Sequence, residues 1–375
     1  MSAQIPPPRM FNGATVHGFF GQKGLRHPAE LVLLGVGVVV TLLVYLLWAT
    51  LLVATLASIG SGGAGAAQLN TQDPAVQTFL VLGALPIIIW VLRAMTYAGQ
   101  RANGVRMSPT QFPEGYRMVV AAAAQFGLRK VPDAYVVSGS GVINAFASGH
   151  GFRRLVAINS DLFEIGGRVR DPEALRFVIS HEVGHIAAGH VSYLRLIFTN
   201  LLGPIPQLGP ALSRSQEYTA DNFGYARQPD GAPGVIAVLA GGKYLNADVN
   251  VFEMADRAVT ERGLWVHIAN WRSSHPVLTW RAHALMDRSR PGRIFFRPRD
   301  AFFSSPLPAG SDLADRWPTP PQVLAMLDAA DAERDLALGE QFGRYPGVDY
   351  AGRPTAREVQ TAQPLLSERR TLPPA

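Results

Sequence analysis

The residues best suited to carry out chemistry form one short motif, His181-Glu182-Val183-Gly184-His185. Histidines four positions apart project from the same face of an α-helix, one turn apart, so both can bind a single metal ion. Glu182 lies about 100° round the helix from His181, which carries it past the ion and within reach of a water molecule bound there. The spacing therefore predicts a metal site on a helix, with Glu182 as the group that moves protons.

A third ligand is needed, because a catalytic zinc site has three protein ligands and one open position. The sequence has no cysteine, so a histidine or a carboxylate must supply it. His190 is excluded, since five residues after His185 it would lie about 140° round a continuous helix. The metzincin pattern is excluded too, because it needs glycine at position 188 and histidine at position 191, where this chain has Ala188 and Val191. We expect His190 to be structural or to face solvent.

The better candidate for the third ligand is Glu217, in the segment RSQEYTAD. Ser213 with Gln216 three residues later resembles a capping box, which predicts that Glu217 lies in the opening turns of a helix. Asp221 follows four residues later on the same face, so it can accept the free ring N–H of a zinc-binding histidine, for which we expect His181. Two solvated acids on a surface helix are the alternative. The motif upstream favours one zinc ion per chain.

Strong local signals surround the motif. Asp171, Pro172 and Glu173 predict a helix start, with an N-cap, a proline at the first helical position and an acid in the first turn. The predicted helix, ALRFVISHEVGHIAAGHVSYLRL, carries both histidines. Residues 134–160 are predicted to form strands, because AYVVSG, GVINAFASG and RRLVAINS are rich in Val, Ile, Ala and aromatic residues between glycine turns. The chain is therefore expected to be an α+β protein, mostly helical with a small sheet.

Two stretches are long and apolar enough to cross a membrane. Residues 31–57 carry no charge, and residues 74–92 are uncharged before Arg93. About 20 residues of helix cross the hydrocarbon core, so a transmembrane hairpin is predicted, with spans at about 31–57 and 74–93. The first span is longer and starts later than a cleaved signal peptide. A buried helical hairpin in a soluble core is the alternative.

The basic residues near these spans predict the orientation. The loop between the spans has no Lys or Arg, whereas both outer flanks do: Arg9, Lys23, Arg26, Arg93, Arg101 and Arg106. Basic residues favour the cytoplasmic side, so both ends of the hairpin and the chain that follows should be cytoplasmic, in a cell-membrane protein with two spans. The net charge is +6, but basic and acidic residues are interspersed, and we do not expect nucleic-acid binding.

The sequence predicts four parts along the chain. We expect a flexible cytoplasmic segment at 1–29, the transmembrane hairpin at 30–98, a zinc-binding catalytic domain at 99–295 and a Pro-rich extension at 296–375. The extension has one helical candidate, at about Pro321–Phe342, before a flexible tail. The oligomeric state is not determined by these patterns.

In four sequence features the chain resembles a family of membrane zinc proteases, which includes the HtpX-type heat-shock proteases and the CAAX prenyl proteases. These features span about residues 74–290: NAFASG at 144–149, HEVGH at 181–185, RSQEYTAD at 214–221, and Ser274-His275-Pro276 followed by Arg281. The resemblance implies a zincin-like domain that hydrolyses peptide bonds, with Asn144, Ala145, Phe146 and Ala147 on an edge strand that binds extended substrate. It also implies that His275 stabilises the oxyanion or caps a helix, and that Arg281 is an ion-pair partner.

The chain departs from these relatives between the motif and Glu217. HtpX-type enzymes have two further spans there, but only 31 residues separate His185 from Glu217, and residues 196–213 contain Pro204, Pro206 and Pro210. This segment is too short for two crossings, so it is expected to be a broken or membrane-dipping helix, or else a buried loop.

The expected function is that of a membrane-anchored, HtpX-like zinc endopeptidase acting on membrane or misfolded proteins in protein quality control. The alternatives are a CAAX-type processing protease, an inactive zinc-binding scaffold, and a membrane adaptor whose motif is accidental. Zinc, polypeptide substrates and the lipid bilayer are the expected partners.

Overall fold

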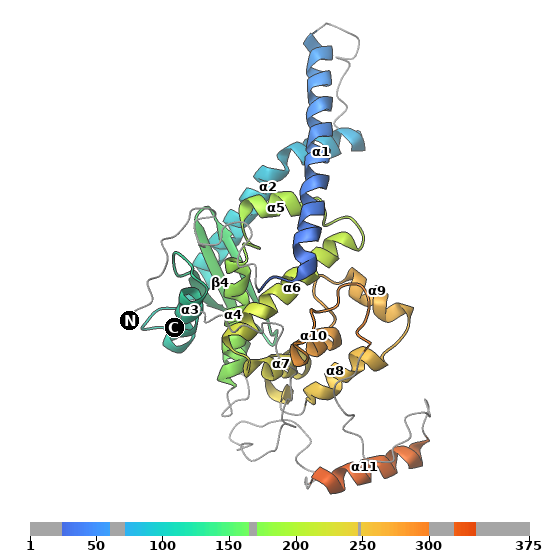
Figure 1. The fold of residues 1–375 in the computed structure, drawn as a ribbon. Helices are drawn as coiled ribbons and strands as arrows, with labels where there is room; N and C mark the ends of the chain where they lie inside the picture. The colour runs from blue at the N-terminus through green and yellow to red at the C-terminus, as the bar shows by residue number, and fades with distance from the viewer. Residues whose placement is uncertain (1–24, 61–71, 165–170, 247–248, 300–318, 335–375) are drawn as a thin grey trace.

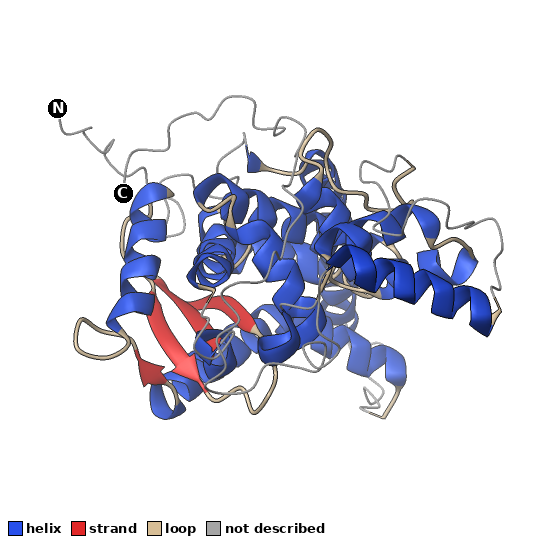
Figure 2. Ribbon diagram, turned by 90° about the horizontal axis from the view of Figure 1, so that it is seen from below, coloured by secondary structure: helices blue, strands red, loops and turns tan. Residues whose placement is uncertain are grey.

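The computed structural model of the chain describes residues 25–60, 72–164, 171–246, 249–299 and 319–334. Its helices are, in chain order, α1 (Pro28–Gly60), α2 (Pro74–Asn103), α3 (Pro113–Gln125), α4 (Pro172–Ala187), α5 (Tyr193–Asn200), α6 (Leu208–Arg227), α7 (Gly231–Leu245), α8 (Val251–Thr260), α9 (Leu264–Arg272), α10 (Leu278–Met286) and α11 (Pro320–Arg334), with a short 3-10 helix at Ser160–Glu164. Its strands are β1 (Val105–Arg106), β2 (Asp133–Val137), β3 (Ala145–His150) and β4 (Arg153–Asn159). The structure is mostly helical with one small sheet, which confirms the expected fold class (Figure 2).

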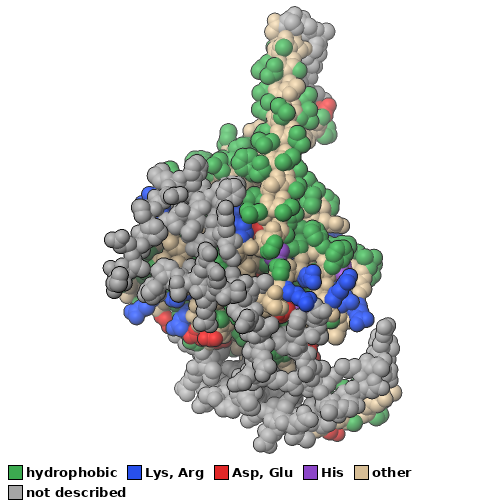
Figure 3. Space-filling view, viewed as in Figure 1, with side chains coloured by type: hydrophobic (Ala, Val, Ile, Leu, Met, Phe, Trp, Pro, Cys, Tyr) green, Lys and Arg blue, Asp and Glu red, His purple; other side chains and the backbone are tan. Residues whose placement is uncertain are grey.

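Helix α1 projects away from the body of the molecule, and its surface is covered with hydrophobic side chains (Figures 1 and 3). In α1 and α2 only 22% and 6% of the most apolar 18-residue window is buried, so both helices expose apolar surface that water would not solvate well. They contact each other where Tyr45 and Trp48 of α1 donate hydrogen bonds to backbone carbonyls of α2. Their length, composition and exposure indicate a membrane protein with two candidate spans.

The sheet has the strand order β1-β2-β4-β3, in which β2 and β4 are parallel and the other pairs are antiparallel. Alternate residues of β4 point to opposite faces. Val156 and Ile158 enter the main core with Ile179 and Val183 of α4, whereas Ala157 packs on the other face near α2. The sheet is thus held between α4 and α2, and β3 is left at one edge.

Helices α4 and α6 pack closely because each presents a glycine to a phenylalanine of the other. A side chain at Gly184 would meet Phe223 at 2.6 Å, and one at Gly224 would meet Phe177 at 2.9 Å. All four residues lie within these two helices, and both phenylalanine side chains are fully buried. The close approach brings the sequence around Glu217 against the helix that carries the two histidines.

Two local predictions were wrong in their boundaries. The helix expected at 174–196 ends at Ala187, and a separate helix, α5, begins after Ser192. The predicted capping box at Ser213 is not a helix start, because α6 begins at Leu208 and Ser213 lies inside it.

The broken helix expected at 196–213 is present, since α5 ends at Asn200 and turns lead to α6. The C-terminal helix predicted at about 321–342 is found as α11, and its expected continuation lies outside the described residues.

Candidate metal centre and active site

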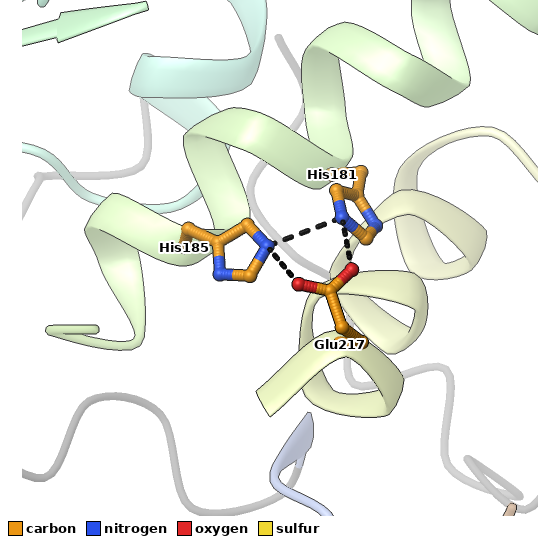
Figure 4. Close-up of side chains that lie close together, drawn as sticks. All are labelled: His181, His185 and Glu217. Atoms are coloured by element: carbon orange, nitrogen blue, oxygen red, sulfur yellow. Dashed lines mark hydrogen bonds and ion pairs between the residues drawn. The ribbon is translucent and has the colours of Figure 1, made fainter. Parts of the chain in front are cut away.

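Two histidines of α4 and one glutamate of α6 point toward one another (Figure 4). The Nε2 atoms of His181 and His185 are 3.1 Å apart, and the Glu217 carboxylate oxygens lie 3.4 Å and 3.5 Å from them. Four ligands at about 2.1 Å from a tetrahedral ion are about 3.4 Å apart, so these separations fit a shared zinc ion. Two imidazoles and a carboxylate are also a donor set that zinc accepts.

Asp221 fixes the orientation of His181. Its Oδ1 lies 2.9 Å from His181 Nδ1, so a proton on Nδ1 leaves the lone pair of Nε2 directed at the site. Arg281 donates to both oxygens of Asp221, at 2.9 Å and 2.6 Å, and so has the ion-pair role expected for it. Burial opposes the charged forms of both groups, but charged neighbours outweigh it. Arg281 and His181 lower the pKa of Asp221 to about 2, and the carboxylates of Asp221 and Glu217 raise the pKa of His181 to about 9, against the opposing charge of Arg281.

Glu217 is kept charged by its histidine neighbours. Burial alone would raise its pKa, but contact with His181 and His185 holds the pKa of this carboxyl below its usual range. A carboxylate ligand must be ionised to bind a metal, so Glu217 is already in the charge state that metal binding requires at neutral pH.

His190 is buried beside the site, so of its two expected roles the structural one fits, but the inference that it points away from His185 was wrong. Its Nδ1 is 2.7 Å from Nδ1 of His185, and the residue is only 5% exposed. The rotation argument failed because α4 does not continue to residue 190. Gly189 adopts a left-handed φ of 78°, and the His190 N–H closes the helix end on the His185 carbonyl at 2.9 Å, in a Schellman motif. The glycine was the available signal for this turn.

Glu182 lies next to these groups but is not one of the three converging side chains. It is 7% exposed, and burial raises its pKa to about 7, with the Glu217 charge adding to the effect and His181 opposing it. The backbone N–H of Ala147 hydrogen-bonds to its carboxylate. A carboxyl group with a pKa near neutrality can both accept and return a proton at physiological pH.

The site opens into a cavity of about 470 Å³. The start of β3 and the residue before it form part of its lining, through Asn144, Ala145, Phe146 and Ala147. The prediction placed all four on the strand, but Asn144 precedes it; β3 is an edge strand, as the resemblance implied. An extended segment entering the cavity would therefore run beside backbone groups as well as the three converging side chains.

His275 also lines this cavity. Its Nε2 is 3.5 Å from Glu217 Oε1, and its side chain is 61% exposed. It does not cap the following helix, since the N-cap of α10 is Val277 and no side chain caps it. The loop is fixed instead by Arg214, which donates to the carbonyls of Asn270 and Ser273 at 2.6 Å and 2.8 Å. This role of Arg214 was not predicted.

Comparison with known protein families gives a match over the catalytic region. The family model of peptidase family M48 matches residues 111–198 and 192–289, which include β2 to β4, the three converging side chains, Glu182, His275 and Arg281. No curated protein matches the chain. The matched region thus contains the whole candidate site and three of the four strands beside it, and this part of the chain is a peptidase family M48 domain.

Proposed function

We propose that the chain is a membrane-anchored, zinc-dependent endopeptidase of the HtpX type, with one zinc ion held by His181, His185 and Glu217. The observation that carries this proposal is that three ligand atoms lie within 4.8 Å of one another, beside a buried carboxyl group that is not among them. This separation of metal ligands from a proton-accepting group is what hydrolysis of a peptide bond requires.

Zinc bound to this donor set would polarise the scissile carbonyl and make a water molecule more acidic. Glu182 accepts the proton of the attacking water and passes it to the leaving amine. Its pKa of about 7 suits both steps, because the group is neither too weak a base nor too weak an acid. Asp221, held by Arg281, keeps the lone pair of His181 Nε2 directed at the site throughout.

Substrate is proposed to bind as an extended strand beside β3. An edge strand has unpaired backbone groups, and Asn144 to Ala147 line the cavity that contains the site. The ring of His275 is exposed on the same cavity and is proposed to stabilise the oxyanion formed at the scissile carbonyl.

The proposed substrates are membrane or misfolded proteins, with protein quality control as the setting. Two candidate spans support a site near the bilayer, and an open cavity beside an edge strand suits an unfolded segment of varied sequence. Both spans are proposed to cross as a hairpin that leaves the catalytic domain in the cytoplasm, from the basic flanks on both sides of it.

The test is made on the full chain purified in detergent. Bound zinc is measured by elemental analysis, and cleavage of casein is followed before and after metal removal by a chelator. We expect about one zinc ion per chain, loss of cleavage with the metal, and recovery when zinc is added back. Cleavage that persists without metal would contradict the proposal. Proteins that accumulate in cells producing Glu182→Gln in place of the wild type would identify the substrates.

A further inference from the structure

The first turn of α1 is buried inside the catalytic domain. Glu30 has no exposed surface, although it lies immediately before the predicted first span. Leu33 and Leu34 pack with Leu212 and Tyr218 of α6, the helix that carries Glu217. The anchor is therefore not joined to the domain by a simple tether, since its first turns are part of the domain's core.

The Glu30 carboxylate contacts groups from both metal-bearing segments. Its Oε1 lies 3.1 Å from Nε2 of His190, just after α4, and its Oε2 accepts a hydrogen bond from Thr219 of α6. It also accepts hydrogen bonds from Arg26 and Arg195. Every one of these partners is at most 8% exposed, so water does not compete for the carboxylate.

The hydrogen bonds from His185 to Glu30 have one consistent direction. His185 can bind a metal through Nε2 only if its proton is on Nδ1, and this N–H must then donate to Nδ1 of His190, 2.7 Å away. A His190 ring that accepts at Nδ1 and is neutral carries its proton on Nε2, where it donates to Glu30. The result is a chain of donors, His185 to His190 to Glu30, that ends on a carboxylate.

This series of hydrogen bonds has the same role for His185 as the contact with Asp221 has for His181. Hydrogen-bonded partners of metal-binding histidines fix the ring and its tautomer, and their loss typically reduces metal affinity about 10–100-fold. His181 is held directly by a carboxylate from α6, whereas His185 is held through a second histidine by a carboxylate from the anchor helix.

We propose that Glu30 is a positioning residue of the metal site: acting through His190, it holds His185 in the tautomer and orientation that bind metal, so that metal affinity depends on the seating of the anchor helix. This inference rests on the metal site proposed above. The competing interpretation is that Glu30 only neutralises Arg26 and Arg195, both of which also donate to the carbonyl of Ala188 at the end of α4.

The experiment measures zinc affinity in the full chain in detergent, by competition with a chromophoric chelator. The variants are Glu30→Gln, His190→Phe and the two combined. Thr41→Val is the matched control, because Thr41 is 2% exposed and donates a hydrogen bond from α1 to the Phe198 carbonyl at 3.0 Å, away from the chain of donors. The visible spectrum of the cobalt-substituted protein gives a second readout of ligand geometry.

If Glu30 acts through His190, each single variant weakens zinc binding about tenfold or more and changes the cobalt spectrum. The double variant then has the same zinc affinity as the single variant with the larger loss, because both substitutions break the same series of hydrogen bonds. Thr41→Val binds zinc as the wild type does. Unchanged affinity in Glu30→Gln, effects that multiply in the combined variant, or an equal loss in Thr41→Val would each overturn the inference. A wild-type chain that binds no zinc would overturn the metal site itself, and with it this inference.

Loss of a buried charge can prevent folding, so a charge-balanced variant is included. Glu30→Gln with Arg26→Gln removes one negative and one positive charge from the cluster, and Arg26→Gln alone is its control. The paired variant is expected to bind zinc about tenfold more weakly than Arg26→Gln, and equal affinity in the two would overturn the inference.

Discussion

Replacing Glu182 with glutamine is expected to stabilise the metal-free protein and to remove most of the activity of the zinc-loaded protein. The physical reason is the cost of keeping this carboxylate charged in a buried site. Raising its pKa from the ordinary 4.5 to about 7 corresponds to about 3 kcal/mol. Because the folded protein holds the proton more tightly than the unfolded chain, this destabilisation develops as pH rises through 4.5 to 7 and is complete above 7. Glutamine is nearly the same size and has no charge to desolvate.

The stability effect is measured by thermal unfolding of the metal-free protein in detergent at two pH values. At pH 8 the variant should unfold several degrees higher than the wild type, since about 1 kcal/mol shifts the midpoint of a domain of this size by roughly 2–4 °C. At pH 4, where the wild-type carboxyl is protonated in both states, the difference should disappear. Equal midpoints at pH 8 would refute the reasoning that Glu182 is held at an electrostatic cost.

The activity of the same variant gives the complementary result. Loss of a positioned general base reduces the rate about 10²–10⁴-fold, while bound zinc should stay near the wild-type amount. His185→Ala is the contrasting variant, because it removes a ligand and should lose zinc as well as activity. Near wild-type activity would show that Glu182 is not the base, and loss of zinc equal to that of His185→Ala would make it a ligand. In the zinc-loaded wild type, kcat/KM should fall as pH decreases and Glu182 takes up a proton, with a midpoint below 7 because the positive charge of zinc lowers the pKa of this carboxyl group.

Three further predictions concern the surroundings of the site. Asp221→Asn should weaken zinc binding about 10–100-fold in a chelator competition, because it removes the carboxylate that orients His181 and leaves Arg281 without its partner; unchanged affinity would contradict this role. His275→Ala should lower kcat on the order of 10²-fold while zinc content and the unfolding midpoint stay close to wild type, and an unchanged kcat would exclude oxyanion stabilisation. Reporter fusions after residue 29 and after residue 105 should both report the cytoplasmic side, and one in the 60–72 loop the opposite side; an external signal after residue 105 would refute the topology.

Much of this protein could be predicted from its sequence because the relevant signals are local. The spacing of His181 and His185 places them on adjacent turns of one helix, and both lie in α4. The two apolar stretches are long enough to predict candidate spans without reference to the rest of the chain, and each lies within one long helix. The three strands beside the site were likewise predicted by short runs of Val, Ile and Ala, although β3 begins four residues later than expected.

The helix boundaries and side-chain partners that were not predicted depend on contacts between residues far apart in the sequence. The residues at Ser213 and Gln216 match the pattern of a capping box, yet α6 begins earlier, at Leu208. The packing of this helix depends on a distant contact, because Gly224 lies against the ring of Phe177 in α4. His190 was assigned to the wrong side because the rotation argument assumed that the helix continued past Gly189.

The sequence by itself determined the chemistry that the site can offer, because residue type and helical spacing are fixed by the order of the chain. Only the tertiary structure decided how that chemistry is supported. Glu30 and His190 are 160 positions apart, and no helical period or turn signal relates them. They meet because apolar residues of α1 pack against α6, and burial then forces each charged group beside it to find a partner.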